Sequence, residues 1–277
     1  MRKLLRADLY RLLRNKIFYL EIIATLVLSV WIVLANYSIE LQATENQLYL
    51  EDVFFNMYQI FGMLLATAVS LLVGNEYSDG TIRNKLVVGH TRLAIYMAQL
   101  LTNLVATTLA LLVHSISSGL LGYALFGSMQ ISIEQFFTMV ACSFLIAWGQ
   151  TTLYTALSMD ISAKAIPSVV AILLSWSMLL CANMVYNQLR EPETTYESIT
   201  ITENGVDFGE AVENPAYIDG ALRTAYEWVL DLLPEGQLLQ IQTGETERMA
   251  HWPPLEVVYF VVTTGMGYVC FRKKDIR

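Results

Sequence analysis

The sequence contains little charge. Only 15% of its 277 residues are Asp, Glu, Lys or Arg, whereas 55% are hydrophobic. A soluble domain carries about 25% charged residues. The apolar residues also come in long blocks and do not alternate with polar ones. This composition excludes an ordinary soluble domain and indicates a chain that crosses a membrane.

Cysteine and histidine are also scarce, with three residues of each type. The cysteines lie inside or at the ends of apolar blocks, and segment 187–253 contains none, so it has no internal disulfide. There is no C-x-x-C motif and no Cys/His cluster to indicate a metal. We therefore expect the cysteines to pack as small hydrophobic side chains and expect no metal site.

Sequence motifs of catalysis are absent. The chain has no G-K-[ST] sequence, which a phosphate-binding loop requires, and neither H-E-x-x-H nor G-x-S-x-G occurs. We therefore predict a non-catalytic chain that binds no cofactor of its own.

What the chain does contain is six apolar blocks. About 20 helical residues span a hydrocarbon core about 30 Å thick. The blocks predict an all-α membrane protein with six transmembrane helices at 17–37, 54–74, 95–122, 136–158, 165–186 and 254–271. The first block follows basic residues, as in a signal peptide, but its length of about 19 residues exceeds the usual 7–15. We interpret it as an uncleaved span.

Basic residues mark one side of the membrane. Of 17 Lys and Arg residues, 14 lie in segments 1–16, 75–93, 159–164 and 271–277. Segment 187–253 carries thirteen acidic residues against three arginines. Because short loops rich in Lys and Arg stay in the cytoplasm, both termini are predicted to be cytoplasmic in a multi-pass protein of the cell (inner, cytoplasmic) membrane. Segment 187–253 is then an extracytoplasmic loop.

Segment 1–16 has the pattern of an amphipathic helix at the membrane surface. Leu5, Leu9 and Leu12 recur at helical spacing, and Arg2 and Arg6 take the other side. Such a helix lies with its basic face toward lipid headgroups. Membrane lipid is thus an expected partner, and nucleic acid is not.

The remaining chain divides in three. Residues 17–186 hold spans one to five with an inner loop at 75–93, and residues 254–277 hold the last span and a basic tail. Within the loop 187–253, residues 190–220 read as irregular. An amphipathic helix is expected near 221–233, ended by Pro234 and Gly236.

Small residues recur every four positions in the second span, at Gly62, Ala66, Ser70 and Gly74. Such a stripe lets membrane helices approach closely. It indicates either helix packing inside one subunit or a dimer interface.

Polar residues occur within two further spans. Thr107, His114 and Ser118 share a face of the third span, and Gln150 lies in the fourth. Intramembrane polar groups face the bundle or a cavity. These four residues are candidates for a transport pathway, in which His114 would carry a proton, or for hydrogen bonds between helices.

The inner loop 75–93 is the most distinctive segment. It opens with Glu76 and Asp79, turns at Gly80 and continues through Thr81 and Ile82. Its apolar residues predict a short helix or turn that docks against something. A plain connection needs only a few polar residues. The alternative is that the acidic residues merely cap helices at the edge of the bilayer.

This loop resembles that of the membrane-spanning subunits of ABC-2 type transporters. The N-terminal helix, the six spans and the large outer loop also match that family. The residues that carry the resemblance are Glu76-Tyr77-Ser78-Asp79-Gly80-Thr81-Ile82, the following Arg83-Asn84-Lys85-Leu86, and Leu233-Pro234-Glu235-Gly236-Gln237 before the last span.

The resemblance implies a permease subunit that works as a homo- or heterodimer with a second permease copy. A separate ATP-binding cassette subunit would bind ATP and Mg. The coupling contact to that subunit would be made by the connecting helix 1–16 and by Glu76, Tyr77, Asp79, Gly80, Thr81 and Ile82. The expected cargo is amphipathic or lipid-like, such as an antimicrobial peptide, and the expected direction is export.

An alternative function is a secondary transporter or channel driven by an ion gradient. Such proteins place ionisable residues near the membrane midplane. This chain has few besides His114, and Glu21 lies near the inner end of the first span.

Overall fold

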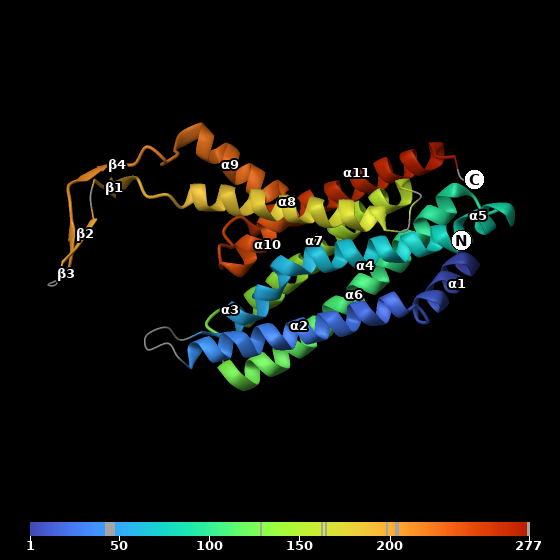
Figure 1. Ribbon diagram of the computed structural model, residues 1–277, viewed down its shortest axis with the longest axis horizontal. Helices are drawn as coiled ribbons and strands as arrows, with labels where there is room; N and C mark the ends of the chain where they lie inside the picture. The colour runs from blue at the N-terminus through green and yellow to red at the C-terminus, as the bar shows by residue number, and fades with distance from the viewer. Residues whose placement is uncertain are drawn as a thin grey trace.

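A computed structural model shows an elongated bundle of helices (Figure 1). It describes residues 1–41, 48–127, 129–161, 163, 165–197, 199–202 and 205–275. The charged residues Glu45, Lys164, Glu203 and Arg277 lie outside this description. Within the described part, six helical segments are long and apolar enough to cross a membrane, which confirms the predicted all-α membrane fold.

The six spans lie where the apolar blocks predict them and extend a few residues further at their ends. The second span is built from a short helix, a 3-10 turn and a long helix. In chain order the spans are α2 (Lys16–Glu40), α3 (Leu50–Phe54) with η1 (Phe55–Met57) and α4 (Tyr58–Ser78), α6 (Arg92–Phe126), α7 (Ile133–Asp160), α8 (Ile166–Leu189), and η2 (Met249–His251) with α11 (Trp252–Lys273).

Polar side chains cap the starts of three spans. Asn15 accepts a hydrogen bond from the backbone N–H of Ile17 at 2.9 Å, ahead of α2. Thr91 and Ser132 do the same at the starts of α6 and α7, each at 3.2 Å from the backbone nitrogen three residues on. These caps satisfy N–H groups that a helix start leaves without an intrahelical partner.

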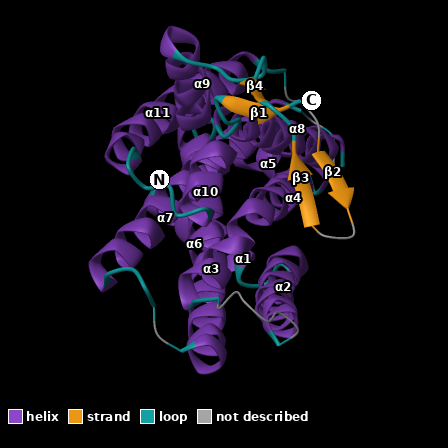
Figure 2. Ribbon diagram, turned by 90° about the vertical axis from the view of Figure 1, so that its left-hand side faces the viewer, coloured by secondary structure: helices purple, strands orange, loops and turns teal. Residues whose placement is uncertain are grey.

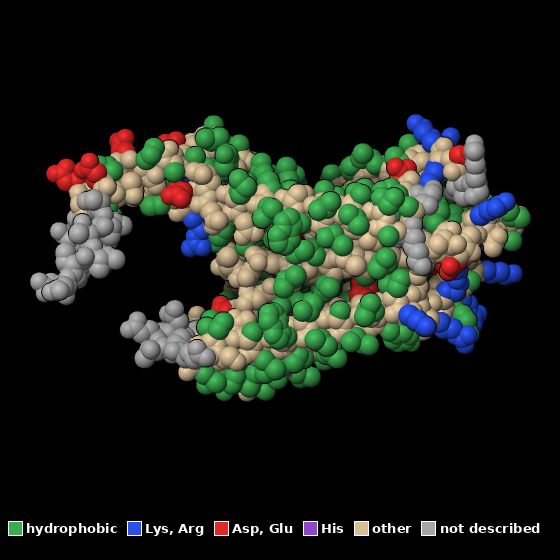
Figure 3. Space-filling view, in the orientation of Figure 1, with side chains coloured by type: hydrophobic (Ala, Val, Ile, Leu, Met, Phe, Trp, Pro, Cys, Tyr) green, Lys and Arg blue, Asp and Glu red, His purple; other side chains and the backbone are tan. Residues whose placement is uncertain are grey.

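The two ends of the bundle differ in charge. The end that carries α1 (Arg2–Leu12), α5 (Thr81–Val87) and the C-terminus gathers Lys and Arg side chains and is called the basic end here (Figures 1 and 3). The opposite end carries Asp and Glu side chains on the outer loop and is called the acidic end. Hydrophobic side chains cover the face between them in Figure 3.

Helix α4 is the central helix of the bundle. In the most apolar 18 residues of the second span, Leu50–Ser78, 67% of the residues are buried inside the bundle. The corresponding share in the last span, Met249–Lys273, is 17%. The small-residue stripe explains this position, because Gly62, Ala66, Ser70 and Gly74 are all buried. A Cβ atom added at Gly62 would lie 2.9 Å from Gln150 Nε2 of α7, and Ser70 accepts a hydrogen bond from Ser158 of α7 at 3.0 Å. The stripe therefore packs inside one subunit, where the chain's own helices cover it.

The outer loop contains strands where the sequence indicated an irregular segment. Strand β1 (Thr194–Tyr196) pairs antiparallel with β4 (Ala211–Glu213), and β2 (Ile199–Thr202) pairs antiparallel with β3 (Gly205–Phe208). The prediction for 190–220 is thus wrong over these strands. Their Thr, Ile and Val residues favour extended backbone.

Two helices follow the strands, and the second enters the bundle. Helix α9 (Gly220–Leu232) lies at the predicted position, and α10 (Pro234–Gln242) follows after one residue. Pro234 does not end the helical region but occupies the first position of α10, where proline is well tolerated. Nearly all of α10 is buried, and Figure 2 shows it among the spans. At Gly236 any Cβ would lie 2.2 Å from the carbonyl oxygen of Leu230, so this tight turn requires glycine.

Two glycines of α11 offer a test of this packing. A Cβ added at Gly267 would lie 2.4 Å from the Cβ of Ala156 in α7, whereas at Gly265 it would meet nothing within 4 Å. We expect Gly267→Ala to lower the free energy of unfolding by about 1–3 kcal/mol through overpacking. Gly265→Ala is the matched control and should leave stability unchanged or slightly higher. Thermal unfolding in detergent measures both, and equal midpoints would contradict the placement of α11 on α7.

Candidate functional site

The segment between α4 and α6 is a folded element at the basic end. Helix α4 ends at Ser78, and Gly80 adopts a left-handed backbone with φ of 65° before α5 begins at Thr81. Gly89, with φ of 95°, closes α5 on its other side. Glycine is the residue that takes this conformation without a steric cost. Of the short helix or turn that the sequence predicts, the structure contains the helix.

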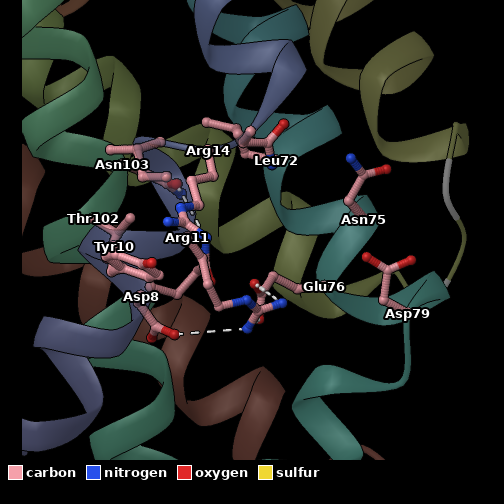
Figure 4. A pocket seen from close by; sticks show the side chains of 13 residues that line it. Asp8, Tyr10, Arg11, Arg14, Leu72, Asn75, Glu76, Asp79, Thr102 and Asn103 are labelled. Carbon is pink, nitrogen blue, oxygen red and sulfur yellow. Dashed lines mark hydrogen bonds and ion pairs between the residues drawn. The ribbon is translucent and has the colours of Figure 1, made fainter.

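The inner side of α5 is held by a cluster of charges. Lys85 Nζ lies 2.8 Å from a carboxylate oxygen of Asp8 in α1 and 2.9 Å from Oε2 of Glu76 in α4. Arg11 of α1 lies 2.9 Å from the other oxygen of Glu76 and donates to the hydroxyl of Thr81 at 2.8 Å. Figure 4 shows Asp8, Arg11 and Glu76 converging in this way. The cluster joins α1, α4 and α5.

The buried part of this cluster matters most for stability. Only 7% of Lys85 and 4% of Asp8 is exposed to solvent. Exposed ion pairs contribute about 0–1 kcal/mol. Removing one partner of a buried pair costs about 3–5 kcal/mol, because the other charge stays buried alone. The position of α5 therefore depends on Lys85 more than on any charge at its surface.

Apolar packing supports the same arrangement. Ile82 of α5 is fully buried in a cluster with Leu4 of α1, Val73 of α4 and Ile95 and Tyr96 of α6. It faces its own chain and is covered there. Hydrophobic burial and the charge cluster thus fix α5 from the same side.

The C-terminal tail is attached beside this element. Arg92 donates to the backbone carbonyls of Phe271 and Lys274 at 2.8 and 2.6 Å. Lys274 in turn donates to the hydroxyl of Tyr77 at 3.0 Å and to the carbonyl of Met159 at 2.8 Å. Desolvation by burial lowers the pKa of Lys274 to about 8, although the nearby Asp160 acts in the opposite direction. These bonds place the end of α11 against α4 and α7.

A polar cavity of about 250 Å³ adjoins the charge cluster (Figure 4). It lies between α1, α4 and α6. Its lining includes Asp8, Arg11, Arg14, Asn75, Glu76, Asp79, Gln99, Thr102 and Asn103. The lining holds three carboxylates, of Asp8, Glu76 and Asp79, and two arginines, Arg11 and Arg14, and Arg11 is already paired with Glu76.

The outer side of α5 is uncovered and exposes two apolar residues at its C-terminal end. Val87 is 79% exposed and Val88 is 76% exposed, at the end of the helix that points away from the bundle. Arg83 and Asn84 are also exposed. Two adjacent valines with this exposure, on a helix fixed from behind, form a surface suited to contact with another protein.

The six residues predicted to contact a partner divide between the two sides. Glu76, Tyr77 and Ile82 point into their own chain, and Thr81 accepts the hydrogen bond from Arg11. Asp79 is exposed, and Gly80 forms the turn. The motif therefore mainly builds and positions the element, while Val87 and Val88, outside the predicted set, supply the apolar part of its exposed surface.

The four polar residues proposed for a pathway are all buried, and two of them, Thr107 and His114, form hydrogen bonds between helices. His114 Nδ1 lies 2.9 Å from the hydroxyl of Ser29 in α2 and 3.2 Å from that of Ser118. The Thr107 hydroxyl lies 2.8 Å from that of Thr151 in α7. Gln150 packs against Gly62. In this structure these residues connect α2, α4, α6 and α7.

Sequence reasoning missed two members of the charge cluster, Asp8 and Arg11. A signal for Asp8 exists, because it is the one acidic residue in the basic segment 1–16. An acid on an otherwise cationic surface helix indicates a specific cationic partner. The sequence does not reveal that this partner is Lys85, 77 residues away.

These features define a multi-pass membrane protein with a preformed helical element at one end. The model of a family described as "ABC-2 family transporter protein" matches residues 4–185. This match covers α1 to α7 and most of α8, including the whole charge cluster. The chain belongs to this family. A comparison with curated proteins finds no match.

Lys85 allows a direct test of the cluster. We expect Lys85→Ala to lower the free energy of unfolding by about 3–5 kcal/mol, because Asp8 and Glu76 would lose their buried cation. Arg83→Ala, on the exposed side of the same helix, should change it by less than about 0.5 kcal/mol. Thermal unfolding of the purified chain measures both. A double-mutant cycle with Asp8→Ala should show coupling, and additive effects would exclude the pair as a stabilising contact.

Proposed function

We propose that this chain is the permease subunit of an ATP-driven exporter whose energy comes from a separate ATP-binding subunit. Membership of the ABC-2 family makes the chain a membrane subunit of an ABC transporter. In the proposal, ATP and Mg bind to the partner, in keeping with the absence of a phosphate-binding loop from the sequence. The permease itself carries out no chemistry.

The observation that carries the proposal is the two-sided character of α5. Its inner side is fixed by Lys85 and Ile82, and its outer side exposes Val87 and Val88. A contact transmits motion only when it is rigid on the side of the receiver. Helix α5 meets this requirement, because a force on the valines reaches α4 through Glu76 and α1 through Asp8.

In the proposal, a force on α5 is transmitted to α4 at the centre of the bundle. Helix α4 packs against α7 and α8 along its stripe of small residues. A displacement of its basic end must therefore be accommodated by both neighbours, since cores are close-packed and deform little. In the proposal, this rearrangement of α4, α7 and α8 changes access for the cargo.

The charge difference between the ends supports a cytoplasmic basic end. In that orientation α1, α5 and the C-terminus face the compartment that holds ATP, and the basic side chains face anionic headgroups of the inner leaflet. The strands, α9 and the acidic side chains then lie outside. The membrane is proposed to be the cell (cytoplasmic) membrane.

Exposed apolar helices support both an amphipathic cargo and a dimer. Large hydrophobic side chains of α8 and α11 are exposed along much of their length, among them Leu173, Trp176, Val258 and Val261. These faces meet either lipid or a second permease copy. A cargo that partitions into the bilayer can reach the subunit from the side.

The alternative of an ion-gradient-driven transporter receives less support. Its main candidate, His114, already bonds through Nδ1 to Ser29 and Ser118. Transport that persists with an ATP-binding subunit unable to hydrolyse ATP, and that stops when the ion gradient is dissipated, would favour the alternative.

Val87 and Val88 test the coupling. We expect the double substitution Val87→Asp and Val88→Asp to abolish copurification with the ATP-binding subunit from native membranes, because burying two carboxylates in an apolar contact is costly. The permease should lose no more than about 2 kcal/mol of stability, because both side chains are largely exposed and the only cost is that of two carboxylates at the C-terminal end of α5. Val212→Asp, on exposed strand β4, is the control. Normal copurification and transport in the double variant would refute the proposed surface.

Orientation can be tested with cysteines at the two ends. In a chain with Cys181→Ser and Cys270→Ser, we expect Thr195→Cys on strand β1 to react with a membrane-impermeant thiol reagent in intact cells. Arg83→Cys on α5 should react only after the membrane is permeabilised. Thr195 and Arg83 are both exposed in the structure. A cysteine at either position that fails to react is therefore shielded by the membrane and not by burial in the protein. If Arg83→Cys reacts in intact cells and Thr195→Cys reacts only after permeabilisation, the basic end lies outside and the proposed orientation is wrong.

A further inference from the structure

Glu21 is a buried carboxylate without a partner. It lies in α2, and 6% of its surface is exposed. Both of its carboxylate oxygens are buried and have no hydrogen-bond partner, and among the described residues no other carboxylate has both oxygens in this state. Ionisable residues inside membrane spans are rare, and they pair with another group or mark a path for a ligand.

The surroundings of Glu21 form an apolar groove between α2 and α4. The groove has a volume of about 130 Å³, and the surface that lines it is almost wholly apolar. Besides Glu21, its walls are Ile17, Leu20 and Ala24 of α2 and Leu64, Thr67, Ala68 and Leu71 of α4. A cavity of about 150 Å³ is enough to hold a benzene-sized molecule. The groove is slightly smaller than that and accepts only a few carbon atoms of a hydrocarbon chain.

The groove opens toward lipid. Leu20 is 64% exposed and Ile23 is 56% exposed on the outer face of α2. Glu21 is five residues inside the start of α2 at Lys16, which corresponds to roughly 7.5 Å along the helix. The carboxylate therefore lies below the level of the basic residues and within the hydrocarbon of the leaflet at the basic end.

From this arrangement we infer that the groove between α2 and α4 binds a membrane-dissolved amphiphile bearing a protonated amine, and that the buried Glu21 side chain turns toward the groove to act as its counter-ion. The inference rests on the proposed transport function in one respect, which is that the amphiphile is cargo. Charge complementarity selects the amine, since the groove has one carboxylate and an apolar wall. An anionic amphiphile would bring two negative charges together, and a neutral one would leave Glu21 without a partner.

A zwitterionic lipid fits less well than a simple amine. In phosphatidylethanolamine the amine is joined to a phosphate. Bringing that amine to Glu21 would draw the phosphate into a groove whose lining contains no Lys or Arg. The groove is thus expected to prefer an amine attached directly to hydrocarbon.

The test uses the full-length chain in phosphatidylcholine nanodiscs and a photoreactive dodecylamine, with the corresponding alcohol and carboxylate as matched probes. We expect at least fivefold more labelling by the amine than by the alcohol, on peptides that cover 17–24 and 64–71. Glu21→Gln, which keeps the shape of the side chain, should reduce amine labelling to the level of the alcohol. Glu40→Gln, at the other end of α2, should leave it unchanged.

Several results would overturn the inference. Equal labelling by amine and alcohol would show that Glu21 is permanently protonated. Loss of amine labelling when phosphatidylethanolamine is included would assign the groove to lipid. Efficient cross-linking between two copies through Leu20→Cys would make it a subunit interface.

Labelling is measured on the permease alone. Its result therefore tests binding in the groove independently of the proposed coupling through Val87 and Val88. A groove-filling variant, Ala68→Phe, provides a second check that does not depend on charge. It should reduce labelling by all three probes in a chain that still unfolds cooperatively.

Discussion

The ammonium group of Lys85 lies between two carboxylates at the point where three helices meet. Without it, Asp8 of α1 and Glu76 of α4 would be two acidic groups close together in a poorly hydrated place. With it, the N-terminal helix, the central span and α5 become one body. The same contact explains why α5 is an ordered helix and not a loose connection, and why α1 lies against the bundle.

This interaction also separates two roles within one short motif. The side chains of Glu76, Ile82 and Lys85 make contacts inside the protein, whereas those of Val87 and Val88 are exposed. In a helix, residues three and four apart share a face, so Ile82 and Lys85 both face the bundle while Val87 lies on the other side of the helix. A motif can therefore be essential to a contact with a partner while most of its residues never touch that partner.

The sequence predicted the six spans well, because blocks of about 20 apolar residues have few other interpretations. It also predicted a short helix at 75–93, from Gly80 and the apolar residues after it. It did not predict the pairing of Asp8 with Lys85, since contacts between distant segments leave no periodic signal. It also missed α10, because Pro234 ends one helix and begins the next, and both patterns look alike in a sequence. The strands of the outer loop were missed because acidic and glycine residues between them resemble those of an irregular loop.

Helix α10 has a consequence for what counts as the folding unit of this protein. It brings Glu235 to Ser175 of α8, at 3.1 Å, and its neighbour α11 packs its Gly267 against α7. Both helices lie beyond residue 185, where the match to the family model ends. A chain cut at that point would leave Gln150 and Ser175 facing an empty space and would uncover one side of α7. The portion that matches the family model therefore ends inside a packed bundle, whose remaining contacts are made by α10 and α11.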